Sequence, residues 1–235
     1  MQEQEFIEKQ KQSLEGKTPL EIIQTVVNEF PEESVFSTSF GLEDQVISDI
    51  ILSNKLPVEI FTLDTGRHFA QTYQVHERVN DKYNTHIKTY YPDTAEIENF
   101  MNSNGPDAFY ISPELRKQCC FIRKVQPLKR ALNGKKIWFT GIRKEQSEER
   151  ASTPVIEYDS GHNIIKVHPL IDWKIDEVWQ HIKKNNVPYN ALHNKGFTSI
   201  GCAPCTRAIA EGEDERTGRW WWENEDLKEC GLHIS

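Results

Sequence analysis

The run SVFSTSFGLED, residues 34–44, places an apolar segment directly before a small polar loop with one glycine. The segment SVFSTSF is typical of a buried strand, and EDQVISDIILS, residues 43–53, has the spacing of an amphipathic helix. A strand that leads through a short loop into a helix is the repeating unit of α/β folds. The run therefore predicts that its strand lies in a parallel sheet with helices packed on it.

The same alternation of strand and helix continues on both sides of this run. Two helices are expected before it, at 3–14 and 19–30. Strands are expected at 58–63, 85–91 and 135–141, and a strand that runs into a turn at 164–173. Further helices are expected at 68–83, 95–103, 119–132 and 174–185. The pattern predicts an α/β sandwich with a mainly parallel sheet, followed by an irregular C-terminal tail.

Three loops at the expected carboxyl ends of strands combine a glycine with small hydroxyl residues and a charge. They span residues 37–44, 63–69 and 140–150. Parallel sheets bind ligands beyond the carboxyl ends of their strands, so these loops are candidates for a binding site. The alternative is that they are ordinary strand-to-helix connections with N-caps.

The composition argues against two classes of protein. The chain has 235 residues and a formal net charge of -8, whereas a general nucleic-acid binder needs a basic surface. No apolar run reaches the roughly 18 to 20 residues of a membrane span. We therefore expect a cytoplasmic protein that binds neither nucleic acid nor membrane, in a compartment where structural disulfides are rare. The oligomeric state stays open, and a homo-oligomer is compatible with the sequence.

The five cysteines fall into an adjacent pair, a spaced pair and a single residue: Cys119 and Cys120, Cys202 and Cys205, and Cys230. Two close pairs of thiols that are far apart in sequence favour a four-cysteine metal site. Adjacent cysteines strain a tetrahedral site around one ion, whereas a 4Fe-4S cluster offers them separate iron atoms. We therefore favour an iron–sulfur cluster over zinc. The alternative is two pairs of buried, inert thiols.

Cys230 remains as a single thiol, with Gly231 and His233 close behind it. A thiolate is a strong nucleophile, and a thiol beside a histidine is a candidate catalytic residue. The alternative is an exposed cysteine without a role. The local sequence alone does not choose between these two interpretations.

Taken together, the motifs resemble the phosphoadenylyl-sulfate reductase family, and within it the assimilatory adenylyl-sulfate reductases. The resemblance is carried by CCFIRK, GCAPCT, GEDERTGRWWW and KECGLH, with STSFGLED, LDTGR and GIRKEQSEER in the matching order. It extends from about Val35 to His233, and the combination of the cysteine motifs with the terminal ECGLH is highly specific. The resemblance implies an adenine-nucleotide α-hydrolase-like sandwich, a Rossmann-like arrangement of strands and helices.

The resemblance also implies a reaction. Cys119, Cys120, Cys202 and Cys205 would bind a 4Fe-4S cluster, and Cys230 would attack the sulfur of adenosine 5′-phosphosulfate. AMP would leave and an S-sulfocysteine would remain on the enzyme. Thioredoxin or a glutaredoxin-like dithiol would then release sulfite. The cluster would organise charge in the site rather than carry electrons, because the dithiol supplies both of them.

By motif match, the resemblance assigns the two ends of the substrate to two groups of residues. Cations would hold the phosphosulfate and screen its charge from the thiolate: Lys124, Arg150, Arg216, Arg219 and His233. Backbone contacts would hold the adenosine, from Ser39, Phe40, Gly41, Leu63 and Gly141. The chain would be a single catalytic domain, 1–235. Its core would span about 19–205, and its tail, about 206–235, would carry the nucleophile.

The loop after the first strand departs from that of related ATP pyrophosphatases. Those proteins carry Ser-Gly-Gly-x-Asp-Ser, whereas residues 39–44 read Ser-Phe-Gly-Leu-Glu-Asp here. One glycine is missing, and an acidic pair occupies the position that cradles pyrophosphate. The departure disfavours ATP cleavage and leaves room for a phosphosulfate.

Three alternative functions stay open. The nearest is reduction of 3′-phosphoadenosine 5′-phosphosulfate, alone or with the unphosphorylated nucleotide. Family members that use only the former typically lack the four cluster cysteines. A cluster-dependent tRNA thiolation enzyme on a similar fold is opposed by the acidic charge and the altered loop. A zinc-stabilised binding module would not be an enzyme at all.

Overall fold

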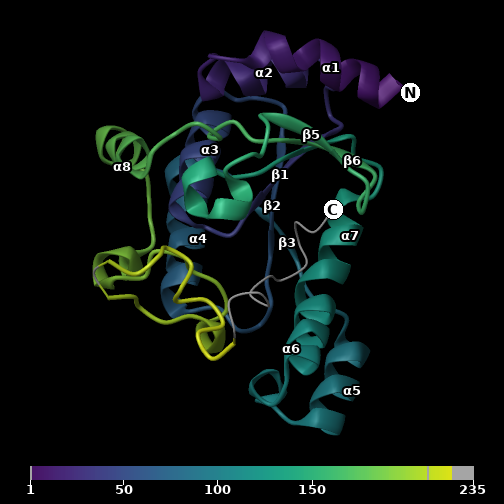
Figure 1. Ribbon diagram of the computed structural model, residues 1–235, viewed down its shortest axis with the longest axis vertical. Helices are drawn as coiled ribbons and strands as arrows, with labels where there is room; N and C mark the ends of the chain where they lie inside the picture. The colour runs from purple at the N-terminus through teal and green to yellow at the C-terminus, as the bar shows by residue number, and fades with distance from the viewer. Residues whose placement is uncertain (1, 211, 224–235) are drawn as a thin grey trace.

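The computed structural model describes residues 2–210 and 212–223, and its centre is a six-stranded sheet (Figure 1). The strands are β1 (Ser34–Thr38), β2 (Glu59–Leu63), β3 (Lys88–Tyr90), β4 (Ile137–Phe139), β5 (Ile156–Asp159) and β6 (Ile164–Val167). Their order in the sheet is β3-β2-β1-β4-β6-β5. All neighbouring pairs are parallel except β5, which pairs antiparallel with β6 at one edge. The predicted α/β architecture with a mainly parallel sheet is confirmed.

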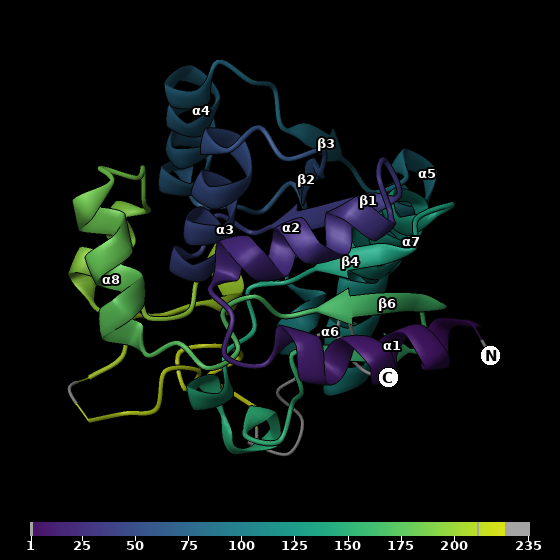
Figure 2. The same cartoon turned by 90° about the horizontal axis from the view of Figure 1, so that it is seen from above.

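Helices cover both faces of this sheet (Figure 2). One face carries α1 (Gln2–Leu14), α2 (Pro19–Glu29), α3 (Leu42–Ser53), α4 (Ala70–Tyr83) and α8 (Ile175–Lys184). The other face carries α5 (Thr94–Asn104), α6 (Pro113–Cys120) and α7 (Gln126–Leu132). None of these described helices is long and apolar enough to cross a membrane.

Alternation along the strands builds the two layers of core. Phe36 of β1 and Phe139 of β4 pack into the larger core beneath α2, α3 and α8. Their neighbours Val35 and Trp138 point to the opposite face and pack against Leu128 of α7. Both faces of the central strands are therefore buried, as the continuous apolar pattern of parallel strands predicts.

The order of the strands reverses between β1 and β4. From β1 the chain proceeds through β2 to β3 at one edge, and then returns through α5, α6 and α7 to place β4 on the other side of β1. The helix that follows β1 (α3) and the helix that precedes β4 (α7) therefore lie on opposite faces of the sheet. In open α/β sheets, such a switch point leaves a crevice beyond the carboxyl ends of the strands, where ligands bind.

The helix expected at 119–132 begins earlier and contains an irregularity. Ser112 caps α6 by accepting from the backbone N–H of Leu115, and Pro113 occupies its first turn. A π-helical turn, Phe121–Val125, then joins α6 to α7. Such turns are frequent at functional sites. This one directly follows the adjacent cysteines Cys119 and Cys120.

The two edge strands also differ from the sequence-based expectation. Strand β5 was not predicted, because half of its residues are polar and it pairs with only one neighbour. The strand expected at 85–91 shortens to β3, which is also an edge strand. After α8, the described residues contain short 3-10 turns at Ala191–Lys195 and Ala203–Cys205 and an isolated antiparallel bridge between Thr206 and Arg219. The sparse pattern of that region predicts this lack of long elements.

Candidate functional site

A cavity of about 220 Å³ lies at the carboxyl ends of β1 and β4. All three glycine-containing loops line it, through residues such as Ser39, Leu63 and Gly141. The irregular segment after α8 closes a further side, through residues such as Ser199 and Arg216. The cavity thus occupies the switch point of the sheet, where the topology predicts a ligand site.

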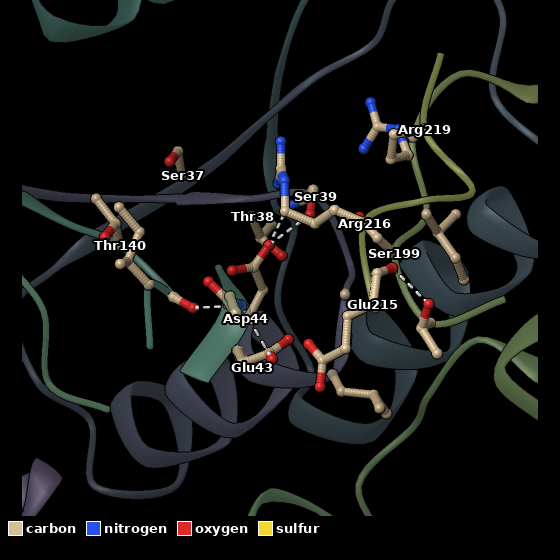
Figure 3. Close-up of a pocket in the computed structure, with 18 of the residues that line it drawn as sticks. Ser37, Thr38, Ser39, Glu43, Asp44, Thr140, Ser199, Glu215, Arg216 and Arg219 are labelled. Atoms are coloured by element: carbon tan, nitrogen blue, oxygen red, sulfur yellow. Dashed lines mark hydrogen bonds between the residues drawn. The ribbon is translucent and has the colours of Figure 1, made fainter. Parts of the chain in front are cut away.

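One side of this cavity is cationic. Figure 3 shows Arg216 and Arg219 together there, both on the segment that follows α8. Lys124 and Arg150 line the same cavity. Arg219 is buried, and its Nε has no hydrogen-bond partner among the described residues. A buried guanidinium with an unused donor is suited to bind the oxygens of a phosphate or sulfate group.

Gly201 makes room for the Arg219 side chain. A Cβ atom at position 201 would lie 2.4 Å from Nη2 and 2.5 Å from Cζ of Arg219. Trp220 contacts the same guanidinium, since Cζ lies 4.7 Å from the centroid of its ring. Contact with backbone and an aromatic ring fixes the orientation of the cation.

The opposite side of the cavity carries uncharged hydroxyl groups. Figure 3 shows Ser37 and Thr140 on this side, away from Arg216 and Arg219. The hydroxyl of Ser37 accepts a hydrogen bond of 2.8 Å from Nε1 of Trp138. A ligand that fits the cavity would therefore place an anionic group at one side and neutral polar groups at the other.

Asp44, at the start of α3, folds its carboxylate back onto the loop after β1. It accepts hydrogen bonds from the backbone N of Ser39 at 2.6 Å and from Oγ of Ser39 at 2.7 Å. Burial raises the pKa of Asp44 to about 6, although these two hydrogen bonds favour the charged form. The carboxylate thus orders the loop, and it becomes protonated as the pH falls through about 6.

The neighbouring acid, Glu43, is neutralised by the buried Arg143. Nε of Arg143 donates to Oε1 of Glu43 at 2.8 Å, and its Nη2 lies 3.3 Å from a carboxylate oxygen of Glu215. Burial raises the pKa of Glu215 against the opposing effect of Arg143. The acidic pair of the loop therefore does not face the cavity as two free charges.

The four paired cysteines come together in a second site, beside the cavity. They are all buried and share one core, here called the cysteine core, which consists of Phe100, Ala108, Phe109, Cys119, Cys120, Ile122, Cys202, Cys205 and Trp220. Cys202 Sγ lies 3.3 Å from Oγ1 of Thr65, in the loop after β2. Segments that are far apart in sequence thus converge on one set of thiols.

The thiols influence one another and face several cations. Burial, and then Cys202 and Cys120, raise the pKa of Cys205 to about 12. Burial also raises the pKa of Cys119, which Cys202 raises further. The cations that oppose these effects, or that interact with Cys120, are Arg67, Arg116, Arg123, Lys124 and Arg219. The cations thus oppose, from several directions, the burial that favours the neutral thiols.

The cysteine core contains four thiols, and hydrogen-bond donors lie near them. Over residues 2–210 and 212–223, no group of three or more His, Cys, Asp or Glu side chains meets the geometry of a metal site. Two buried donors near the thiols, Nε of Arg123 and Nε1 of Trp220, also have no described partner. Cluster sulfurs accept such hydrogen bonds.

The structure places most of the expected substrate-binding residues around the cavity: Lys124, Arg150, Arg216, Arg219, Ser39, Gly41, Leu63 and Gly141. Phe40 is the exception, because its ring is buried and stacks on His76, with ring centroids 4.9 Å apart. Its backbone adopts a positive φ of 61°, which turns the loop toward the cavity. Cys230 and His233 lie outside the described residues.

Several residues of the site were not singled out from the sequence. Arg143 lay within the noted GIRKEQSEER motif, but only the fold shows that it binds Glu43 and Glu215. Arg67 carried no signal beyond its place in LDTGR, and Thr140 stood in the strand-end loop without an assigned role. A basic residue directly after the glycine of a strand-end loop was the available clue for Arg67.

The comparisons with known proteins agree with this geometry. Residues 33–208 match the model of the phosphoadenosine phosphosulfate reductase domain. The chain is 50% identical over 214 residues to adenosine 5′-phosphosulfate reductase of Allochromatium vinosum, across 91% of this chain and 83% of that protein. It is 45% identical over 216 residues to the protein of the same name from Burkholderia cepacia, across 92% and 86%.

Two solved structures illustrate the likeness of fold. Phosphoadenylyl-sulfate reductase from Candida auris, in a phosphate complex, matches with a TM-score of 0.74 and 33% identity, over 88% of this chain and 97% of that one. FMN adenylyltransferase from Candida glabrata matches with a TM-score of 0.56 and 18% identity, over 97% and 80%. The second likeness concerns the fold alone. The expected adenine-nucleotide α-hydrolase-like sandwich is confirmed.

Proposed function

Because the chain belongs to the phosphoadenosine phosphosulfate reductase domain family, we propose that it reduces adenosine 5′-phosphosulfate to sulfite and AMP in assimilatory sulfate reduction. The curated relatives at 45% to 50% identity carry the name of this activity. The chain is then an oxidoreductase whose two electrons come from a dithiol protein.

One observation carries the proposal, namely that the cationic side of the cavity adjoins the cysteine core. Trp220 belongs to the cysteine core and also lines the cavity. Lys124 lines the cavity and also lowers the pKa of Cys205 through its charge. An anion bound at this side would therefore lie near four thiols, an arrangement that fits a cluster-dependent reductase of a phosphosulfate.

The proposed reaction starts at Cys230, which lies outside the described residues. Its thiolate attacks the sulfur of the phosphosulfate, a sulfur–sulfur bond forms, and AMP leaves with the electron pair of the broken sulfur–oxygen bond. A dithiol of the thioredoxin or glutaredoxin type then attacks Sγ of Cys230, and sulfite leaves with the electron pair of the sulfur–sulfur bond. The second thiol of the partner resolves the mixed disulfide, so the partner is oxidised by two electrons.

The cavity residues contribute electrostatics and positioning to this reaction. A thiolate and a phosphosulfate repel each other, and cations fixed around the anion reduce this repulsion. Lys124, Arg150, Arg216 and Arg219 fill this role, together with His233, which also lies outside the described residues. Backbone groups of Ser39, Phe40, Gly41, Leu63 and Gly141 hold the adenosine. Arg219 is oriented before the substrate arrives, since Gly201 and Trp220 fix its guanidinium.

We further propose that Cys119, Cys120, Cys202 and Cys205 hold a 4Fe-4S cluster. When bound, the cluster supplies a fixed buried charge beside the cationic side of the cavity. The shared burial of the thiols and the unpartnered donors of Arg123 and Trp220 support this assignment. With a cluster bound, the protein should be brown and absorb broadly at roughly 400 nm, whereas a zinc protein would be colourless.

The organisation of the chain follows from this function. We propose one catalytic domain, 1–235, with a core at about 19–205 and a tail at about 206–235 that carries the nucleophile. The cytoplasm is the proposed compartment, because dithiol reductants are kept reduced there. The related 3′-phosphorylated nucleotide is the alternative substrate, and a comparison of kcat/KM for the two nucleotides decides between them.

The test uses purified protein, adenosine phosphosulfate radiolabelled on sulfur, and no thiol. We expect a covalent label on the protein, which an added dithiol releases as sulfite, and no label on Cys230→Ser. A label that persists on Cys230→Ser would reject the nucleophile. AMP release without any covalent label would reject the S-sulfocysteine route.

A further inference from the structure

A line of three hydrogen-bonded side chains runs from the cavity, through a buried histidine, to the edge of the sheet. Oγ1 of Thr140 lies 2.6 Å from Nδ1 of His168, and Nε2 of the same imidazole lies 3.3 Å from Oε1 of Glu157. His168 is fully buried, and Thr140 lines the cavity. The three residues come from the end of β4, the end of β6 and the edge strand β5.

The chemistry of this line fixes the direction of each hydrogen bond. Burial lowers the pKa of His168, so the imidazole is neutral and has one donor and one acceptor nitrogen. The hydrogen bond from His168 lowers the pKa of Glu157, whose carboxylate can only accept. Nε2 therefore carries the proton and donates to Glu157. Nδ1 is left as the acceptor, so the hydroxyl proton of Thr140 points to His168.

Thr140 can consequently offer only oxygen lone pairs to a ligand. Its backbone N–H is also engaged, since it donates to the carbonyl of Val167 at 3.0 Å. Phosphate and sulfate oxygens are acceptors and gain nothing from such a group. A hydroxyl or amino group of a ligand, in contrast, can donate to it.

The neighbouring Ser37 is not restricted in this way. Its oxygen accepts from Nε1 of Trp138, which leaves its own proton available to a ligand. Ser37 and Thr140 stand one position beyond the paired residues Phe36 and Phe139 of β1 and β4, so the two hydroxyls are neighbours. They lie on the side of the cavity away from Arg216 and Arg219 (Figure 3).

We propose that Thr140 is a specificity-determining residue that accepts a hydrogen bond from a donor group of the nucleoside, and that His168 and Glu157 are positioning residues that hold it in this state. The inference rests on the proposed function, because it takes the ligand to be an adenine nucleotide. Two donor groups have the required chemistry, a ribose hydroxyl and the exocyclic amine of adenine. If the donor is a ribose hydroxyl, a nucleotide that carries a phosphate on that hydroxyl would bind poorly, because the phosphate ester has no proton to donate to Thr140.

The test is calorimetric titration of the intact wild-type protein and of Thr140→Val with four nucleotides. These are AMP, 2′-deoxy-AMP, 3′-deoxy-AMP and inosine monophosphate, in which a carbonyl replaces the exocyclic amine. We expect Thr140→Val to bind AMP about tenfold more weakly, since one hydrogen bond to a buried acceptor is lost. The analogue that lacks the recognised donor should bind to both proteins with equal affinity, which identifies the donor.

Two further variants separate recognition from structure. Thr140→Ser keeps the hydroxyl and should bind AMP as the wild type does. Ser37→Ala removes a hydroxyl that donates to the ligand and does not accept from it. The loss of affinity that this variant causes should therefore be the same for all four nucleotides, whichever donor group the nucleotide lacks. If Thr140→Val weakens all four nucleotides equally, or none of them, the inference is wrong while the proposed function stands. If the wild type binds no AMP, the proposed function fails, and the inference fails with it.

Discussion

Nε of Arg143 lies 2.8 Å from Oε1 of Glu43, and this contact joins the loop after β4 to the first turn of α3. The same guanidinium lies 3.3 Å from Glu215, which precedes Arg216 on the cationic side of the cavity. Arg143 is fully buried. One buried cation therefore holds three walls of the cavity in place.

Arg143→Met should destabilise the protein, because it leaves the partly buried carboxylates of Glu43 and Glu215 without their fully buried cationic partner. Breaking a buried ion pair by removing one charge costs about 3 to 5 kcal/mol. Denaturant unfolding measures this loss. The matched control is Lys144→Met, whose ion pair with Asp172 is exposed and whose loss should cost less than about 1 kcal/mol. Equal costs for the two variants would contradict the role given to Arg143.

Glu223→Gln should destabilise the protein around the cysteine core. Arg116 donates to both carboxylate oxygens of Glu223, at 3.0 and 2.8 Å, and the two side chains are 1% and 3% exposed. Arg116 also interacts electrostatically with Cys120. Loss of the buried carboxylate should therefore lower stability by about 3 kcal/mol and speed the loss of iron in air, followed by absorbance and iron content.

The control for this variant is Glu213→Gln. Glu213 pairs with Arg207, and these side chains are 33% and 38% exposed, so the exchange should cost less than about 1 kcal/mol. Iron should be retained at the wild-type rate. The same rate of iron loss in both variants would show that the Arg116 pair does not support the cysteine core.

Gly201→Ala should weaken anion binding without unfolding the protein. The new methyl group would overlap the Arg219 guanidinium, which must then leave its place between Gly201 and Trp220. We expect an affinity for AMP about tenfold lower, the equivalent of one lost hydrogen bond. The control is Gly134→Ala, where a Cβ meets nothing within 4 Å but φ is 76°. That variant should lose stability and keep its affinity for AMP.

Asp44→Asn should change how anion binding depends on pH. The pKa of Asp44 is raised to about 6, so its carboxyl is mostly neutral at pH 5 and mostly charged at pH 7. The charged form repels a bound anion. The affinity of the wild type for AMP, divided by that of Asp44→Asn, should therefore fall between pH 5 and pH 7. The titration of AMP itself affects both proteins and cancels in the ratio. A ratio that does not change between pH 5 and pH 7 would show that the charge of Asp44 does not affect anion binding.

The alternation of apolar and polar segments predicted most of the fold. SVFSTSF and EDQVISDIILS gave β1 and α3 because strand and helix periodicities are local properties of the chain. Strand β5 was not predicted, because an edge strand with polar residues has no strong local pattern. The order β2-β1-β4, which creates the switch point, depends on pairing between distant segments and is not encoded in any one of them.

The sequence predicted those parts of the candidate site that depend on the type and spacing of residues. It did not predict the parts that depend on contacts between distant residues. Spacing singled out the four paired cysteines, and the fold brings them into one core. Nothing in the sequence states that Arg143 faces Glu43, or that His168 reaches Thr140, since 100 and 28 residues separate the partners. Such contacts emerge only when the sheet brings the ends of its strands together.

The π-helical turn Phe121–Val125 joins α6 to α7, and the number of residues in this turn matters as much as their identity. Each residue of an α-helix turns the chain by about 100°. Deleting Phe121, Ile122 or Val125 would restore a regular helix and shift Cys119 and Cys120 relative to α7, with every cysteine and cation still present. A single insertion would have the opposite sense. Apart from Arg123 and Lys124, the segment should therefore tolerate exchanges of side chain better than a change in residue number.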